Sequence, residues 1–140
     1  LVIWTMFDPD VRKLTVELEK KFGQGTVSRF WGGNRKTRLE EEDRFLNESK
    51  RRFMIATPAA ARFGREWKIA SQAAYYTNSD NLEHRVQSEA RILAFDKDDW
   101  SVYYDFVAPG TVEVKIIQSL IKKNSLASQV DGRKWREWLE

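Results

Sequence analysis

Two polar side chains stand four positions apart in the segment "LEHRVQSEARILAF", residues 82–95. Gln87 and Arg91 would lie one turn apart on the same face of a helix, because residues four apart share a face. A guanidinium stays charged and donates paired hydrogen bonds, so Arg91 would suit an anionic ligand or a surface ion pair with a neighbouring acid. The next position of the stripe is Ala94, where the polar pattern ends.

Most other catalytic patterns are absent from the chain. It has no cysteine and one histidine, His84, which excludes thiolate metal sites and disfavours a histidine zinc site or a Ser-His-Asp triad. Its neighbours Glu83 and Arg85 predict an exposed helical histidine. Asp8 and Asp10 are better explained as a helix N-cap and a first-turn acid than as a metal pair. Neither a P-loop nor a dinucleotide-binding glycine motif is present, so no metal or phosphate-loop site is predicted.

The composition is that of one folded domain. The 140 residues are 41% hydrophobic and 13% aromatic, which suffices for a core and argues against disorder. A net charge of +3 permits an anionic partner without requiring one. No apolar run approaches the roughly 20 residues of a membrane helix, and no signal peptide is visible, so a cytoplasmic protein is expected. Because Leu1 opens an apolar run without an initiator Met, we expect a piece of a longer protein.

Apolar periodicity predicts strands that alternate with helices along nearly the whole chain. The expected strands are 1–7, 26–31, 52–58, 73–77 and 101–108. The expected helices are 8–23, 37–50, 82–95 and 111–130, with a short amphipathic tail helix at 133–140. Residues 59–72 are expected to form a loop with room for a short helix. Asp8 and the segment Asn78–Asp80 are the expected N-caps of the first and third helices.

This alternation predicts an α/β fold, with a mostly parallel central sheet and helices on both faces. Ligands of such sheets bind at the carboxyl ends of the strands, in the loops that follow them. The loops in question are those around 6–8, 31–36, 56–66 and 77–81. The polar stripe of Gln87 and Arg91 follows the last of these loops.

Four pieces of the chain carry a family resemblance when they are taken in order. They are "VIWTMF" (2–7), "WGGNRKTRLEEEDRFLN" (31–47), "IATPAAARFGREWKIASQAAYYTNSDNLEHRVQSEAR" (55–91) and "VYYDFVAPGTVEVKIIQSLIKK" (102–123). Together they resemble the second RecA-like lobe of superfamily 2 helicases, from motif IV through motifs V and VI. The closest branch is the Swi/Snf-type group with its compact bacterial and phage members. The resemblance implies a RecA-like three-layer sandwich over 1–130, with 131–140 as an amphipathic helix packed on it or on a missing lobe.

The resemblance also implies a mechanism. In this family two RecA-like lobes clamp ATP between them, and cycles of closure move the lobes along a nucleic-acid backbone. The N-terminal lobe of the same protein would carry the P-loop and hold most of the contacts to ATP with Mg²⁺. The second lobe would contribute motif V and the motif VI arginines, which stabilise charge on the transferring phosphoryl group. The implied partners are that N-terminal lobe and a nucleic acid, for which DNA is favoured over RNA. No membrane partner is implied.

The resemblance also implies roles for single residues of this sequence, according to their positions in the family motifs. Thr57 corresponds to the motif V residue near a nucleic-acid phosphate, and Gly64 to the glycine that lets the backbone pass close to the nucleotide. Gln87 and Arg91 correspond to the first two landmarks of motif VI, and Arg91 would be the catalytic residue. The expected nucleic-acid contacts are Thr57, Arg38, Asn78 and Ser79.

The sequence also departs from the family pattern. Motif VI resembles Q-x-x-D-R-x-x-R, but Ala90 replaces its acid and Ala94 its second arginine, the finger. Loss of an arginine finger removes a factor of about 10³–10⁵ in well-studied phosphoryl-transfer enzymes. Either another arginine takes its place, with Arg62, Arg65 and Arg85 as candidates, or the lobe binds more than it catalyses.

Two hypotheses of different classes follow from the sequence. The first is the C-terminal motor lobe of an ATP-dependent helicase or DNA translocase, inactive as an isolated fragment. The second is a degenerate lobe that acts as a nucleic-acid-binding or protein-interaction module without ATPase activity. The sequence leaves open duplex DNA, single-stranded DNA or RNA, as well as polarity, pathway and oligomeric state.

Overall fold

The computed structural model describes residues 1–62, 66–93 and 100–130, without the side chains of 126–130. The strands are β1 (Val2–Trp4), β2 (Val27–Phe30), β3 (Phe53–Ala56), β4 (Gln72–Tyr75) and β5 (Val102–Asp105). The helices are α1 (Asp8–Phe22), α2 (Arg38–Asn47), α3 (Leu82–Ala90) and α4 (Val112–Val130), with short 3₁₀ helices η1 (Gly32–Asn34) and η2 (Ala60–Arg62). The expected alternation of strands and helices is confirmed, and the expected tail helix at 133–140 lies outside the described residues.

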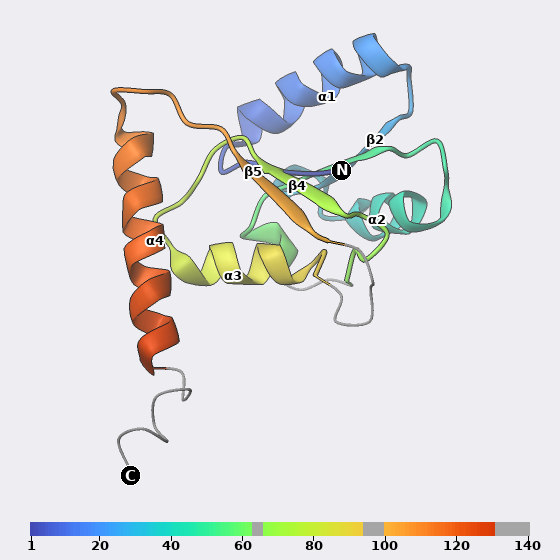
Figure 1. Cartoon of the computed structure of the whole chain (residues 1–140). Coiled ribbons are helices and arrows are strands. Elements are labelled where there is room, and N and C mark those ends of the chain that lie inside the picture. Colours follow the sequence, from blue (N-terminus) through green and yellow to red (C-terminus); the bar gives the residue numbers. More distant parts are fainter. Residues whose placement is uncertain (63–65, 94–99, 131–140) are drawn as a thin grey trace.

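All strand pairs of the sheet are parallel, in the order β2-β3-β1-β4-β5. Ile3 of the central strand β1 lies in register with Ile55 of β3 and with Ala74 of β4. The chain therefore runs from β1 out to β2, returns to β3, and then crosses β1 to reach β4 (Figure 1). Because every strand points the same way, the loops that follow β1, β3 and β4 gather at one edge of the sheet.

Helices cover both faces of the sheet, as predicted (Figure 1). Side chains alternate along β1, so Ile3 packs towards α1 with Val11, whereas Val2 and Trp4 pack on the opposite face with Phe45 of α2. β1 and β3 are buried along their whole length, which is typical of strands covered on both sides. The α/β three-layer architecture expected from the sequence is confirmed.

An aromatic cluster fills the face beneath α2. The Trp67 ring stacks on Trp4 with 5.5 Å between centroids and meets Phe30 and Phe45 edge-on at 5.7 and 6.4 Å. Its indole Nε1 donates a 2.7 Å hydrogen bond to Oε1 of Glu42, a carboxylate that is fully buried. Burying a charged group requires such a partner, so Trp67 both fills the core and satisfies the Glu42 side chain of α2.

The edge strand β5 is covered much less than the centre of the sheet. Val102, Tyr104 and Phe106 are exposed by 39%, 47% and 59%, whereas Tyr103 packs against the core from the other face. On α4, whose side chains are described as far as residue 125, Leu120 is the buried residue. Apolar burial therefore holds β5 and α4 less firmly than it holds β1 and β3.

Two predicted helix caps are wrong. α1 begins at Asp8 itself, with Phe7 in the capping position, because Pro9 is tolerated anywhere in the first turn and does not fix the boundary. α3 is capped by Asn81, whose Oδ1 accepts a 2.9 Å hydrogen bond from the amide of Glu83. The amide of Asn78, which was expected to help cap this helix, bonds instead to Asp105 of β5.

Candidate nucleotide and nucleic-acid edge

The segment after β3 turns sharply at the carboxyl edge. The Thr57 amide donates to the carbonyl of Phe30 at 3.1 Å, and the Thr57 carbonyl accepts from the amides of Ala60 and Ala61 at 3.1 and 3.0 Å. Thr57, an expected nucleic-acid contact, is 7% exposed, so its backbone starts η2 while its side chain is largely covered. The turn presents Arg62 at the surface.

Arg91 ties the end of α3 to this turn. Its guanidinium donates to the carbonyl of Ala61 and lies 5.8 Å from the centroid of the Trp67 ring. Its own carbonyl accepts from the Trp67 amide at 2.6 Å. Burial lowers the pKa of the Arg91 guanidinium, and the nearby carboxylates of Glu42 and Glu66 oppose that shift. The expected catalytic arginine thus lies where α3 and η2 meet.

Gln87 lies on the same side of α3 as Arg91, as their spacing predicts. Both residues border a narrow groove with Pro58 and Ala61, and the groove leaves no room for a water molecule. The Gln87 amide nitrogen donates to Oε1 of Glu83 at 2.9 Å. In the described part of this edge, the side chains of Gln87 and Arg91 therefore bond within the protein, to Glu83 and to the Ala61 carbonyl.

Arg62 reaches the same carboxylate from η2. Its guanidinium donates to Oε1 of Glu83 at 3.3 Å, so one oxygen accepts from both Arg62 and Gln87. The side chains of Arg62 and Glu83 are 59% and 55% exposed. Two donors, one from η2 and one from α3, therefore bind the same carboxylate oxygen of Glu83.

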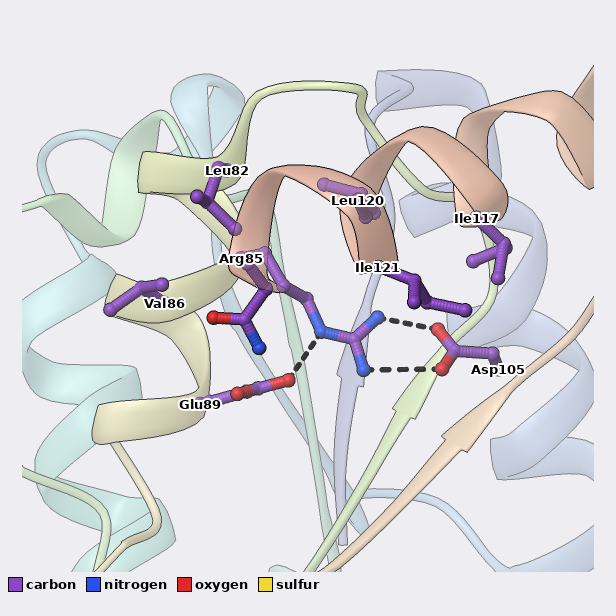
Figure 2. A pocket seen from close by; sticks show the side chains of 9 residues that line it. Leu82, Arg85, Val86, Glu89, Asp105, Ile117, Leu120 and Ile121 are labelled. Atoms are coloured by element: carbon purple, nitrogen blue, oxygen red, sulfur yellow. Dashed lines mark hydrogen bonds and ion pairs between the residues drawn. The ribbon is translucent and has the colours of Figure 1, made fainter. Parts of the chain in front are cut away.

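Arg85 lies at the centre of a separate network, and Figure 2 shows its contacts with Asp105 and Glu89. Its guanidinium donates to both oxygens of Asp105 at 2.5 and 3.1 Å, to Glu89 at 2.5 Å and to Asn78 at 3.1 Å. It also lies 3.7 Å from the centroid of the Tyr75 ring. Burial alone would lower the pKa of Arg85, but the hydrogen bonds of Asp105 and Glu89 outweigh it, and the pKa is raised. These contacts join α3 to β4 and β5.

A cavity of about 140 Å³ lies beside this network, between α3 and α4 (Figure 2). Leu82 and Val86 of α3 face Ile117 and Leu120 of α4 across it. Its polar wall is the Arg85 network, in which the charges already satisfy one another. The cavity therefore combines apolar side chains with a polar wall of paired charges, and Asn124 of α4 also lines it.

The remaining expected nucleic-acid contacts do not converge. Arg38 opens α2, and its guanidinium lies 5.3 Å from the centroid of the Phe30 ring. Asn78 bonds within the Arg85 network, and the Ser79 hydroxyl accepts from the Asn81 amide at 3.0 Å. Arg38 follows β2 and Asn78 follows β4, two strands that β3 and β1 separate. Gly64, Arg65 and Ala94 lie outside the described residues.

The sequence did not predict the surroundings of three residues, which are Glu42, His84 and Gly33. Glu42 is buried, and its spacing from apolar Phe45 and Leu46 on α2 was the available signal. His84 was expected to be exposed, but this residue of α3 is half-buried beside Pro58. Its Nδ1 has no hydrogen-bond partner among the described residues. A Cβ at Gly33 would lie 2.5 Å from the Trp31 ring, a close approach that only glycine allows.

The described residues carry no metal centre and no membrane span. Within residues 1–62, 66–93 and 100–130, no three acidic or histidine side chains are grouped as they would be around a metal ion. No helix in those ranges is long and apolar enough to cross a membrane.

Comparisons with known proteins support the fold. Neither a protein-family model nor a curated protein matches this sequence. Among solved structures, the chain is similar to the crystal structure of the C-terminal part of the Fun30 ATPase domain, with a TM-score of 0.75 and 18% sequence identity. The likeness covers 85% of this chain and 38% of the other. At this identity the likeness establishes the fold, an α/β sandwich of the RecA-like kind.

Proposed function

We propose that this chain is the C-terminal motor lobe of an ATP-dependent helicase or DNA translocase of the Swi/Snf type. The observation that carries the proposal is the contact between η2 and α3, the segments that resemble motifs V and VI. Arg91 joins them through the carbonyl of Ala61 at the edge where parallel sheets bind ligands. The similarity to the C-terminal part of an ATPase domain supports the same assignment.

In this function the chain contributes one half of a shared ATP site. Gln87 and Arg91 would donate hydrogen bonds to phosphate oxygens, and charge on the transferring group would be stabilised by guanidinium. The described residues offer no acidic cluster for Mg²⁺, which the N-terminal lobe would hold together with most of the nucleotide. Nucleic acid, DNA before RNA, would cross the loops that follow β2, β3 and β4. The cytoplasmic location and the bacterial or phage branch remain predictions.

A second candidate is a binding module without ATPase activity. Ala90, which is exposed, stands where the family pattern has an acid, and Ala94 stands where it has the finger. Arg91 is already bonded to the backbone of Ala61. A lobe that has lost these groups could still bind nucleic acid or a protein.

ATP hydrolysis by the full-length protein, with and without duplex DNA, separates the two candidates. The motor predicts DNA-stimulated turnover, and the isolated chain should show none because half of the site is elsewhere. An Ala94→Arg variant is the matched probe. Turnover that appears only in this variant would mean that the alanine disables an otherwise complete site. No turnover in either protein, with DNA binding retained, would favour the module.

A further inference from the structure

We propose that Arg62 provides the phosphate-contacting guanidinium that the Ala94 position lacks, and that the Glu83 carboxylate occupies the position that a phosphate oxygen would take. The inference rests on the proposed function, because it names a catalytic residue of the same ATP site. It starts from three arginines that could replace the finger, which are Arg62, Arg65 and Arg85.

The contacts of Arg85 exclude it from this role. Its side chain is 15% exposed, and it binds both oxygens of Asp105 as well as Glu89. Turning the guanidinium towards a nucleotide would leave two partly buried carboxylates without their partner, which is strongly unfavourable. Arg85 therefore belongs to the scaffold that joins α3 to β5.

Arg62 has the opposite properties. Its side chain is 59% exposed, and its ion pair with Glu83 is one between two exposed groups. Such pairs contribute little to stability and exchange easily for another anion, since water and salt screen them. The guanidinium can therefore leave Glu83 for a phosphate without disturbing the core.

The position of Glu83 shows where an anionic oxygen fits. Its Oε1 accepts hydrogen bonds from Arg62 of η2 and from Gln87 of α3. A phosphate oxygen has the same charge and accepts the same donors, so it can replace this carboxylate oxygen. Arg62 also follows Ala61 directly, and the Ala61 carbonyl binds Arg91. One short turn thus carries Arg62 and positions Arg91.

The chemistry needs no bond to Arg62. In ATP hydrolysis the oxygen of water bonds to the γ-phosphorus while the bond from that phosphorus to the β–γ bridging oxygen breaks. The electron pair leaves with ADP, and the proton of the water passes to solvent. Arg62 would donate hydrogen bonds to the γ-phosphate oxygens, where charge must be stabilised as the bond breaks.

The test measures kcat and KM for ATP in the full-length protein at saturating duplex DNA. Arg62→Ala should lower kcat by about 100-fold or more, by analogy with removal of one transition-state donor. Arg62→Lys, which keeps the charge but not the paired donors, should recover part of the loss. Glu83→Gln should lower KM, because a competing negative charge is removed. Arg44→Ala, at an exposed arginine of α2, is the matched control and should change neither constant.

The outcomes separate the inference from the function on which it rests. Wild-type turnover that Arg62→Ala leaves intact would overturn the inference and keep the motor. A loss seen with Arg65→Ala but not with Arg62→Ala would assign the role to Arg65 and also overturn it. Absence of DNA-stimulated turnover in the wild type would overturn both.

Discussion

The β4–α3–β5 corner and the η2 turn hold two arginines in opposite ways. In the corner, Arg85 is 15% exposed and bonded to Asp105, Glu89 and Asn78. On η2, Arg62 is 59% exposed and paired with Glu83. A buried and saturated guanidinium holds elements together, whereas an exposed one is available to a ligand. Under the proposed function, the corner is therefore scaffold and the η2 turn carries the chemistry.

This difference affects stability, because few apolar side chains are buried at the corner. β5 exposes Val102 and Tyr104, in contrast to β3, which is buried throughout. The Arg85–Asp105 pair is consequently a principal side-chain link between α3 and this edge strand. The η2 turn is linked to the core differently: Arg91 bonds to the Ala61 carbonyl, and its own carbonyl accepts from the amide of Trp67, whose ring lies in the aromatic core.

The largest effect on stability should come from removing the Trp67 ring. Trp67→Ala empties a site packed against Trp4, Phe30 and Phe45 and leaves Glu42 buried without its indole donor. We expect a loss of about 3–5 kcal/mol in the free energy of unfolding, measured by urea denaturation. Trp100→Ala, at an indole that is 89% exposed, should change it by less than about 0.5 kcal/mol. A small loss for Trp67→Ala would mean that the aromatic core contributes little to stability.

Breaking the corner should come second. Arg85→Ala leaves Asp105 and Glu89 without their cation, at a site that is only partly buried. We expect the free energy of unfolding to fall by about 2–3 kcal/mol, somewhat less than for a fully buried pair. Arg44→Ala serves as the surface control in the same urea titrations. Equal effects from the two substitutions would show that the network contributes no more than surface charges do.

Tyr75 offers a pH-dependent test of the same corner. Burial raises the pKa of its hydroxyl above the ordinary value near 10. The neutral phenol is thus favoured in the folded state, so its contribution is complete below pH 10 and is lost as pH rises towards the folded pKa. This residue should make the free energy of unfolding fall by about 1.4 kcal/mol per pH unit above 10. Tyr75→Phe should lack that component, and an unchanged slope in the variant would contradict the assignment.

The smallest effect on stability should come from the η2 turn itself. Arg62→Ala removes an exposed ion pair and should change the free energy of unfolding by less than about 0.5 kcal/mol. Thermal and urea unfolding of this variant would check the expectation. A loss as large as that of Arg85→Ala would place Arg62 in the scaffold and remove the contrast between the two regions.

Sequence patterns predict local structure, but they do not predict contacts between residues that are far apart in the chain. The strands, the helices and the shared side of Gln87 and Arg91 follow from periodicity, which acts over a few residues. The order of the sheet depends on a crossover that periodicity does not contain, so the sequence predicted a mostly parallel sheet but no strand order. The neighbours of Arg85 in sequence do not reveal its role, because Asp105, which settles that role, lies 20 residues further along.

Turnover of ATP by the full-length protein, with and without duplex DNA, tests the central claim most directly. We expect DNA-stimulated hydrolysis that Arg62→Ala lowers by about 100-fold or more and that Arg44→Ala leaves unchanged. A wild-type protein that binds DNA but hydrolyses no ATP, with or without Ala94→Arg, would contradict the account and leave a nucleic-acid-binding module in its place.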